Sequence, residues 1–419
     1  MGGTDQVRGT RRSPAATNGG VVITRNLDSD AVINLDHGDP TMYESFWRKM
    51  GDKCTVVFKG HESLSYFSNV KNPCWFLEPK LEDSIKSLHG AVGNAVTDGY
   101  SIVVGTGSSQ LLQAVLYAVS RDQTTQMNVV SPAPYYSSYP EIIDLVKSGL
   151  YKWAGDAYVF DKDEPYIELV TSPNNPNGVI RGAVVNRDDG ILIHDLAYYW
   201  PQYTPITSSL SFDIMLFTAS KCTGHAGSRI GWALVKDKEV AKRMTKYIEV
   251  NTIGVSKESQ IRVAKILQVV ADGCKRFGSP DGDNFFEFSK TLMAKRWEIL
   301  RETVKNTRMF TLPKYPLQHC NYTGDVTQGH PAFAWIKCKE GIEDCEKLFR
   351  GKNILTRSGR RFGSDPGYVR VSMVSKEEDF DAFIERLSAI QSFNNGDGNG
   401  IANGNGNGIA NGNGNGNLD

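Results

Sequence analysis

Short runs of apolar residues alternate with helical periodicity over the central part of the chain. The run SIVVG at residues 101–105 predicts a buried strand, and the pattern after it predicts a helix over about residues 108–120. We expect further strands at residues 127–131, 166–171, 190–194, 213–218 and 230–235. Nearly continuous apolar strands separated by crossovers indicate a mainly parallel sheet with helices on both faces. Ligands of such folds bind at the carboxyl ends of the strands.

The C-terminal part of the chain shows a different pattern. Ser256 is placed to cap one helix, and a second long helical pattern covers about residues 284–306. From 311 to 393, strand-like segments at 332–336 and 368–373 mix with short helices. The expected fold class is therefore α/β, with a large domain on a mainly parallel sheet and a smaller α+β domain.

Neither end of the chain has the composition of a folded domain. Residues 1–30 are rich in Gly, Ser, Thr and Arg without periodicity, which predicts a disordered N-terminal segment. Residues 394–419 consist almost entirely of Asn and Gly, which predicts a low-complexity tail. The folded part is expected to lie between these ends, with no linker inside it.

Composition narrows the classes of function. The 419 residues include 47 Lys+Arg and 47 Asp+Glu, so no basic field is present that would gather nucleic acid or anionic lipid. No run of 18 apolar residues predicts a membrane span, and the N-terminus lacks the apolar run of a signal peptide. The seven cysteines are scattered without metal-site spacing, which favours reduced thiols. We therefore expect a cytoplasmic protein that acts on small molecules and has no metal site.

Polar residues follow several of the predicted strands. Thr106-Gly107-Ser108-Ser109 opens a helix, where backbone N–H groups and hydroxyls suit a phosphate, although a capped turn is an equal interpretation. The turn Ser172-Pro-Asn-Asn-Pro-Asn-Gly178 is explained by turn chemistry alone. Asp195, at the end of another strand, requires a cation or a donor unless it caps the next helix.

The segment with the clearest chemistry is Thr218-Ala219-Ser220-Lys221, which Arg229 follows eight residues later. Desolvation and a nearby guanidinium both lower the pKa of an ammonium group, which leaves an amine that can attack an aldehyde. A lysine in a surface loop is the common alternative. The Gly, Ser and Thr neighbours favour a Schiff-base lysine here.

Together these segments resemble the aspartate-aminotransferase-like fold of pyridoxal-phosphate enzymes. Longer stretches narrow this resemblance. They are NLDHGDPT (34–41), Tyr43, FWRKMG (46–51), CWFLEP (74–79), VGTGS (104–108), SPNNP (172–176), HD (194–195), AYYW (197–200), SK (220–221) and TGHAGSRIGW (223–232). These stretches resemble the plant alliinase-related group and, within it, the tryptophan aminotransferases of auxin biosynthesis. The resemblance covers about residues 32–387 and both expected domains.

The resemblance implies pyridoxal 5′-phosphate as the cofactor and assigns a role to each matching residue. Lys221 would bind the cofactor aldehyde and move the proton released at Cα. Asp195 would pair with the pyridinium N–H, and Asn175 and Tyr198 would hydrogen-bond the phenolic oxygen. Tyr135 would stack on the ring, with Tyr136 as the alternative. The remaining residues of the implied cofactor site are Thr106, Gly107, Ser108, Ser109, Leu196, Ala197, Thr218, Ala219, Ser220 and Arg229, with Tyr66 reaching the phosphate from the second subunit of a homodimer.

The resemblance also implies a substrate site. Arg370, in YVRVSM, would bind the substrate α-carboxylate, and Gly38 would bring its backbone to the same group. Asn175 is assigned to the substrate site as well as to the cofactor site. The aromatic residues Tyr43, Phe46 and Trp47 are expected to belong to the core more than to an indole pocket. Tryptophan as the substrate therefore depends on the resemblance alone.

The implied domains extend these assignments to the whole chain. They are an N-terminal part of the small domain with an arm to the substrate site (31–60), a large cofactor-binding domain (61–308) and a C-terminal small domain (309–393).

The implied reaction converts L-tryptophan and a 2-oxo acid, with pyruvate favoured, to indole-3-pyruvate and an amino acid. The alternatives are an alliinase-type carbon–sulfur lyase acting on cysteine sulfoxides and a non-catalytic descendant. The non-catalytic descendant is disfavoured because such a protein would have lost the lysine or the aspartate, whereas Lys221, Asp195, Arg229 and Arg370 are all present.

Overall fold

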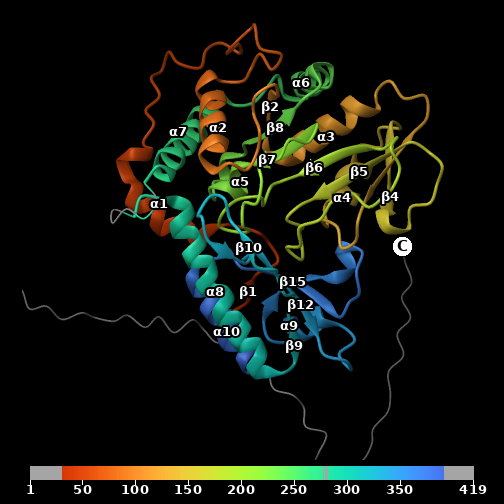
Figure 1. Cartoon of the computed structure of the whole chain (residues 1–419), viewed down its shortest axis with the longest axis vertical. Coiled ribbons are helices and arrows are strands. Elements are labelled where there is room, and N and C mark those ends of the chain that lie inside the picture. The colour runs from red at the N-terminus through yellow and green to blue at the C-terminus, as the bar shows by residue number, and fades with distance from the viewer. Residues whose placement is uncertain (1–30, 277, 279–281, 391–419) are drawn as a thin grey trace, which may run out of the picture.

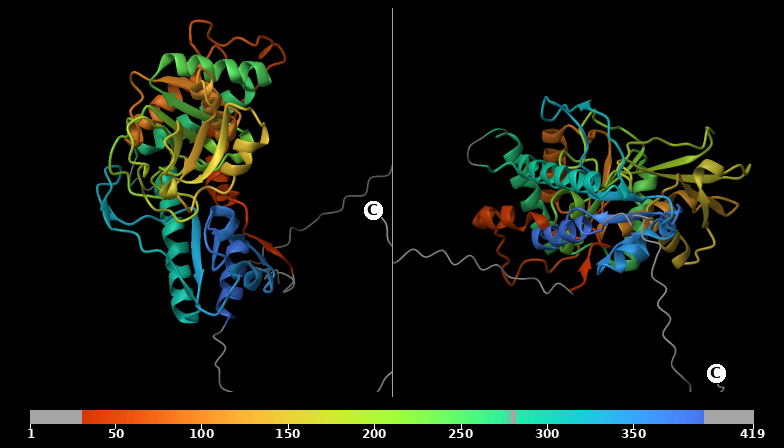
Figure 2. Two further views of the ribbon diagram at one scale, coloured as in Figure 1. Left: turned by 90° about the vertical axis from the view of Figure 1, so that its right-hand side faces the viewer. Right: turned by 90° about the horizontal axis from the view of Figure 1, so that it is seen from below.

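A computed structural model describes residues 31–276, 278 and 282–390. The predicted disordered segment and the predicted low-complexity tail lie outside these residues. The described chain forms a larger lobe around one sheet and a smaller lobe around another (Figures 1 and 2). Within the described ranges, no helix combines the length and the apolar character needed to cross a membrane.

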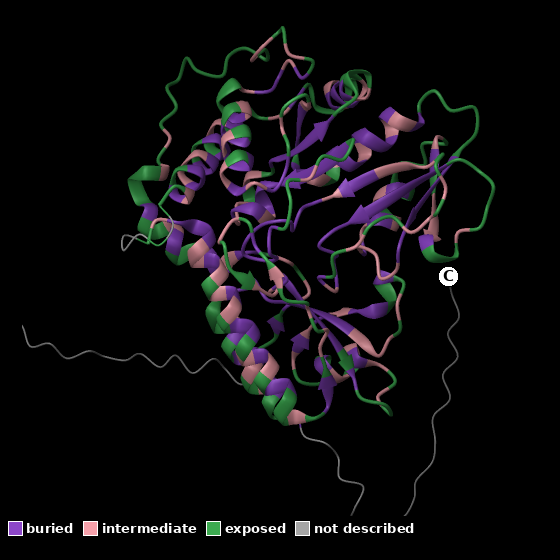
Figure 3. Ribbon diagram, in the orientation of Figure 1, coloured by how far each residue is buried: buried purple, intermediate pink, exposed green. Residues whose placement is uncertain are grey.

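A seven-stranded sheet forms the centre of the larger lobe. Its strand order is β2-β8-β7-β6-β5-β3-β4, and only β8 runs antiparallel to its neighbours. Most of its strand residues are buried, as the centre of the lobe in Figure 3 shows. The strands are β2 (Ser101–Gly105), β3 (Met127–Ser131), β4 (Tyr151–Asp156), β5 (Tyr166–Thr171), β6 (Ile191–Asp195), β7 (Ile214–Thr218) and β8 (Gly231–Val235). The predicted mainly parallel sheet is confirmed.

Helices of the larger lobe cover this sheet. The helix α3 begins directly after β2, as predicted, and α7 begins after its N-cap Ser256, whose hydroxyl accepts a hydrogen bond from the Ser259 N–H. The helices are α1 (Glu44–Met50), α2 (Pro79–Val92), α3 (Gly107–Ser120), α4 (Tyr139–Leu145), α5 (Ala219–Cys222), α6 (Lys238–Thr252) and α7 (Lys257–Cys274). The sequence patterns had not identified β4, α2 or α6.

The smaller lobe combines a four-stranded antiparallel sheet with helices. The long helix α8 (Phe285–Thr307) leads into it and packs along α10 (Glu377–Ser388) (Figure 1). The sheet order is β14-β15-β12-β9, and β1 pairs with β13 beside it. The remaining elements are β1 (Ile33–Asn34), β9 (Phe310–Thr311), β10 (Gln318–His319), β11 (Val326–Thr327), β12 (Phe333–Cys338), α9 (Cys345–Arg350), β13 (Ile354–Leu355), β14 (Arg357–Ser358) and β15 (Tyr368–Ser372). The pairing of β1 with β13 brings the N-terminal segment to the smaller lobe, while the proposed domain boundaries stay predictions.

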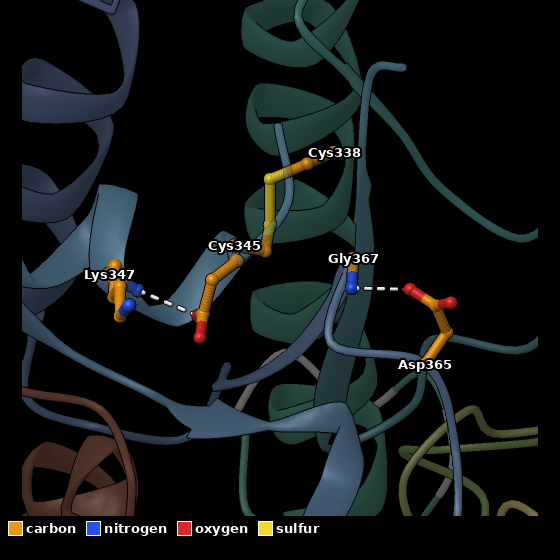
Figure 4. The surroundings of a disulfide bond; sticks show 6 residues. Cys338, Cys345, Lys347, Asp365 and Gly367 are labelled. Carbon is orange, nitrogen blue, oxygen red and sulfur yellow. Dashed lines mark hydrogen bonds between the residues drawn. A yellow bond between two sulfur atoms is a disulfide. The ribbon is translucent and has the colours of Figure 1, made fainter. Parts of the chain in front are cut away.

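A disulfide joins Cys338, the last residue of β12, to Cys345, the first residue of α9. The prediction that all seven thiols are reduced is therefore wrong for this pair. Their Cα atoms are 5.8 Å apart, within the reach of a disulfide, because the strand end and the helix start meet. Figure 4 shows the bond near the turn in which the Asp365 carboxylate accepts from the Gly367 N–H. At the start of α9, the N-cap Asp344 accepts from the Lys347 N–H.

Candidate active site

The carboxyl ends of β5, β6 and β7 meet the first turn of α3 around a cavity of about 200 Å³. This is the position at which ligands bind in open α/β sheets. The residues that line it come from segments far apart in the sequence. They are Ser108, Ser109, Tyr136, Thr171, Asn175, Asp195, Ala197, Tyr198, Thr218, Ser220, Lys221, Ala226 and Arg229.

Lys221 lies in the short helix α5, directly after β7. Thr218, the last residue of β7, is the N-cap of this helix, and its hydroxyl accepts a hydrogen bond from the Ser220 N–H. The Lys221 Nζ donates to the Gly38 carbonyl at 2.5 Å. Burial of the amine, reinforced by Arg370 and more weakly by Arg229, lowers the pKa of Lys221 to about 8. The amine is therefore closer to its neutral, nucleophilic form at physiological pH than an exposed lysine would be.

Asp195 is the last residue of β6, and its carboxylate faces the same cavity. It accepts hydrogen bonds from the Tyr139 hydroxyl at 2.8 Å and from the Ala197 N–H at 3.1 Å. Burial raises the pKa of Asp195, while these two hydrogen bonds lower it. Neither donor supplies a positive charge. A cationic N–H placed in the cavity would therefore give this carboxylate the partner that its desolvation requires.

Asn175, which lines the cavity, is hydrogen-bonded to two other predicted site residues, Tyr198 and Arg370. Its side-chain amide donates to the Tyr198 hydroxyl at 3.3 Å, and its Oδ1 accepts from Arg370 Nη1 at 3.0 Å. Burial raises the pKa of Tyr198 well above its ordinary value, so the phenol stays protonated. The pair consequently presents an amide N–H and a phenol O–H, which are suitable donors for an oxygen anion.

The first turn of α3 and Arg229 form a cradle for an anion. Ser108 and Ser109 lie in that turn, where the N–H groups of a 14-residue helix are directed outward. Gly107 has a φ of +74°, and a Cβ at this position would lie 2.3 Å from Arg229 Nη2. The lack of a side chain at Gly107 therefore makes the space in which the Arg229 guanidinium lies. Thr218 and Ser220 add hydroxyl groups to the same wall.

Arg370 and Gly38 lie at the border between the lobes. Arg370 is 2% exposed, and its guanidinium carbon lies 4.0 Å from the centre of the Phe333 ring. Its Nε is buried without a hydrogen-bond partner. A Cβ on Gly38 would lie 2.6 Å from the Phe333 ring and 3.1 Å from Lys221 Nζ. Gly38 thus allows the N-terminal segment to approach the lysine closely, beside an arginine that has a free donor.

Several predicted site residues do not line the cavity of their own chain. Leu196 and Ala219 are fully buried, and Thr106 is an exposed N-cap of α3. Tyr66 is 66% exposed on the long irregular segment before α2. Tyr135 packs against Trp153, whereas Tyr136 lines the cavity. The structure therefore brings the alternative tyrosine, and not Tyr135, to the cavity.

Other residues of the site were not identified from the sequence. Tyr139 holds Asp195, Phe333 packs on Arg370, and the Asp36 carbonyl accepts from Arg370. Tyr139 follows a tyrosine-rich turn after β3, and this run of aromatic residues is the only local signal that could have suggested it. Asp36 lies in the stretch NLDHGDPT, but nothing in the sequence pairs it or Phe333 with Arg370, because these contacts join distant segments.

The aromatic residues after the N-terminal segment belong to the core, as expected. Tyr43 and Phe46 pack edge-on against Phe285 and are almost fully buried. Trp47 stacks on the same ring and donates its indole N–H to the Thr223 carbonyl. None of the three lines the cavity.

Comparisons with known proteins agree with this geometry. The family model Alliinase_C, described as Allinase, matches residues 33–391. Tryptophan aminotransferase-related protein 2 of Arabidopsis thaliana is 56% identical over 370 residues, which cover 88% of this chain and 83% of that protein. An alliin lyase of Allium cepa var. aggregatum is 38% identical over 362 residues, covering 84% and 79%. The solved aspartate aminotransferase from Thermus thermophilus with maleate has a TM-score of 0.60 at 18% identity and covers 86% of this chain and 92% of that one. The predicted aspartate-aminotransferase-like fold is confirmed.

Proposed function

The chain belongs to the alliinase family, and we propose that it is a pyridoxal-phosphate-dependent aminotransferase. The proposed reaction converts L-tryptophan and a 2-oxo acid, with pyruvate preferred, to indole-3-pyruvate and the corresponding amino acid. The observation that carries the proposal is the meeting of Lys221, Asp195 and Arg229 around one small cavity, with Arg370 at its border. The 56% identical relative, whose name contains tryptophan aminotransferase, supports the choice of substrate.

The donors and acceptors around the cavity fit pyridoxal phosphate. When bound, this cofactor supplies an aldehyde for an amine and a ring that accepts electrons from Cα. Asp195 would hold the ring nitrogen in its protonated form, and Arg229 with the first turn of α3 would bind the phosphate. Asn175 and Tyr198 would donate to the ring oxygen. Tyr136, which lines the cavity together with Tyr198, would lie against the ring.

Lys221 has two tasks in this proposal. Its amine would hold the cofactor by the aldehyde, and after displacement by substrate it would take the proton from the substrate Cα. A pKa of about 8 suits both tasks, because the neutral fraction near neutral pH is then far larger than that of an exposed lysine. The backbone of the lysine is fixed by Tyr203, whose hydroxyl donates to the Lys221 carbonyl at 3.2 Å.

Arg370 would orient the substrate through its α-carboxylate. A planar guanidinium binds a carboxylate through two parallel hydrogen bonds, which fixes direction as well as charge. The buried Nε of Arg370, which has no partner, is one donor that such a carboxylate would satisfy. Phe333 lies against this guanidinium and the Tyr198 ring, and so offers an aromatic surface beside the site.

We further propose a homodimer in which Tyr66 of each protomer reaches the phosphate in the other. The irregular segment before α2 exposes large apolar side chains that a second copy would cover, among them Val57, Leu64, Phe67 and Val70. The proposed setting is the cytoplasm, and the proposed role is the supply of indole-3-pyruvate for auxin (indole-3-acetic acid) synthesis.

Tracing of the amino nitrogen tests the reaction directly. The purified enzyme, loaded with pyridoxal phosphate, is incubated with ¹⁵N-labelled L-tryptophan and pyruvate. We expect the label in alanine, together with an equal amount of indole-3-pyruvate. Release of the label as ammonium would contradict aminotransfer. The alliin lyase relatives favour the lyase alternative, which the same assay tests with a cysteine sulfoxide as the substrate. A lyase would yield pyruvate and ammonium from it without any acceptor.

A further inference from the structure

We propose that Arg357 is a positioning residue that keeps the Asp36 carboxylate away from Arg370, so that Arg370 stays open to the carboxylate of a substrate. This inference rests on the proposed function, because it concerns the binding of the amino acid at the same site. It assigns a role to an ion pair that lies outside the cavity and touches neither the lysine nor the aspartate of the cofactor site.

Two arginines face each other across the smaller sheet. Arg357 of β14 is the register partner of Arg370 of β15 in an antiparallel pair. Like charges directly opposite each other destabilise a sheet. Burial lowers the pKa of Arg370, and the positive charge of Arg357 lowers it further. A negative charge is therefore needed beside this pair.

Asp36 supplies that charge and contacts both arginines through different atoms. Its carboxylate accepts from Arg357 Nε at 2.5 Å and from Arg357 Nη2 at 3.2 Å. Its backbone carbonyl accepts from Arg370 Nη2 at 2.5 Å. Arg357 also donates from Nη1 to the Ser137 hydroxyl at 3.0 Å, which ties the arrangement to the loop that carries Tyr136. The carboxylate is therefore bound by one arginine while a neutral carbonyl contacts the other.

The choice of partner matters because Arg370 attracts any carboxylate within its reach. Its Nη1 donates to Asn175 and its Nη2 to the Asp36 carbonyl, while its Nε has no partner. Without Arg357, the Asp36 carboxylate would lose its two charge-assisted hydrogen bonds. The other cationic groups that act on this carboxylate are the buried Arg370 and, more weakly, the exposed His37 ring at 4.0 Å. An internal carboxylate on Arg370 would compete with the substrate. Arg357 prevents this competition by holding Asp36 in two hydrogen bonds.

Three variants test the inference: Arg357→Met, Asp36→Asn and the double variant. In Arg357→Met we expect the KM for the amino acid to rise about tenfold or more, with a smaller change in kcat. In Asp36→Asn, which has no competing charge, the rise should be about threefold or less. The double variant should recover most of the loss of Arg357→Met, because the released carboxylate is absent. A double variant no better than Arg357→Met would overturn the inference and leave the pair a merely structural role.

A matched control and a second readout complete the design. Arg350→Met removes an arginine of the same lobe whose partner Glu346 lies four residues away on α9, and the KM should not change. Calorimetric binding of 3-indolepropionate, a carboxylate without an amino group, follows the site independently of turnover. If the enzyme shows no aminotransferase activity but the variants bind 3-indolepropionate in the expected order of affinity, only the proposed function is contradicted. Equal affinities in all variants would contradict the inference alone.

Discussion

The two ends of the seven-stranded sheet carry cavities of very different kinds. The cavity at the amino ends of β6 and β7 measures about 850 Å³ and includes His194, whereas the cavity at the carboxyl ends measures about 200 Å³ and includes the next residue, Asp195. In the larger one the cations already have partners, since Lys236 pairs with Asp213 at 3.3 Å and Arg243 pairs with Asp122. In the smaller one Lys221 contacts only a neutral carbonyl, and Asp195 only neutral donors. Incomplete charge pairing, and not volume, therefore distinguishes the end of the sheet at which we place the proposed reaction.

The largest effect is expected from removal of the lysine at the smaller cavity. Lys221→Ala should reduce turnover on the order of 10³-fold or more, because both the amine that holds the cofactor and the proton acceptor are lost. The variant should keep its oligomeric state by light scattering. Lys236→Ala, the same substitution beside the larger cavity, is the control and should leave turnover unchanged. Full activity in Lys221→Ala would contradict the assignment of the reaction to the smaller cavity.

Removal of the charge of Asp195 should have the next largest effect. Asp195→Asn keeps the shape of the side chain, and we expect kcat to fall by about 10²–10³-fold because the ring nitrogen loses its anionic partner. The dissociation constant of pyridoxal phosphate should rise as well, which equilibrium dialysis of the apoprotein measures. An unchanged kcat with unchanged cofactor affinity would mean that the Asp195 carboxylate serves only to cap its turn.

Arg370→Lys tests the substrate side of the smaller cavity. Lysine keeps the charge but loses the planar pair of donors, so the KM for the amino acid should rise about 10-fold or more. The absorbance of the bound cofactor should stay as in the parent enzyme, because Arg370 does not line the cofactor cavity. Steady-state kinetics at varied amino acid concentration measure the effect. A loss of cofactor binding instead would place Arg370 on the cofactor and not on the substrate.

The lowered pKa of Lys221 predicts a pH dependence for the capture of the cofactor. Below its pKa of about 8 the amine is protonated and cannot attack an aldehyde. The rate at which apoprotein captures pyridoxal phosphate should therefore fall about tenfold for each pH unit below 8 and level off above it. Stopped-flow absorbance follows the reaction. A midpoint near the ordinary pKa of an exposed lysine would show that burial does not tune this amine.

The smallest effect on catalysis is expected from His194→Asn, next to Asp195 on the same strand. The His194 ring stacks on Phe212 with centroids 3.6 Å apart, and burial lowers its pKa to about 4. The substitution should cost about 1–2 kcal/mol of unfolding free energy through lost packing. Turnover should stay within about twofold of the parent enzyme, since the side chain faces the other cavity. A large loss of turnover at unchanged stability would show that His194 contributes to catalysis although it lines the larger cavity.

Local patterns predicted those features that depend on short stretches of chain. The predicted strands at 127–131 and 166–171 have the bounds that the structure shows, because every residue of both strands is buried and most of them are apolar, although Asn128 and Glu168 interrupt the apolar runs. The antiparallel direction of β8 had no signal, since a strand buried on both faces reads alike in either direction. The edge strand β4 was missed because its polar and half-buried residues break the apolar run.

For the site, sequence order indicated residues at or shortly after the ends of strands, such as Asp195 and Lys221. It could not predict contacts between distant segments. Tyr139 reaches Asp195 across 56 residues, and Arg370 reaches Asp36 across 334. The disulfide was missed for a different reason: Cys338 and Cys345 are seven residues apart, but the scattered spacing of the cysteines favoured reduced thiols. Residue type and spacing therefore indicate the chemistry, while the tertiary fold selects the partners that tune it.

The most direct test of the account is a single turnover without an acceptor. Purified enzyme carrying pyridoxal phosphate is mixed with L-tryptophan, and the products and the cofactor absorbance are followed together. We predict one indole-3-pyruvate for each occupied site, loss of the original absorbance and no free ammonia. An unchanged absorbance with tryptophan, together with continuous release of pyruvate and ammonia from a cysteine sulfoxide, would contradict the account and identify a lyase.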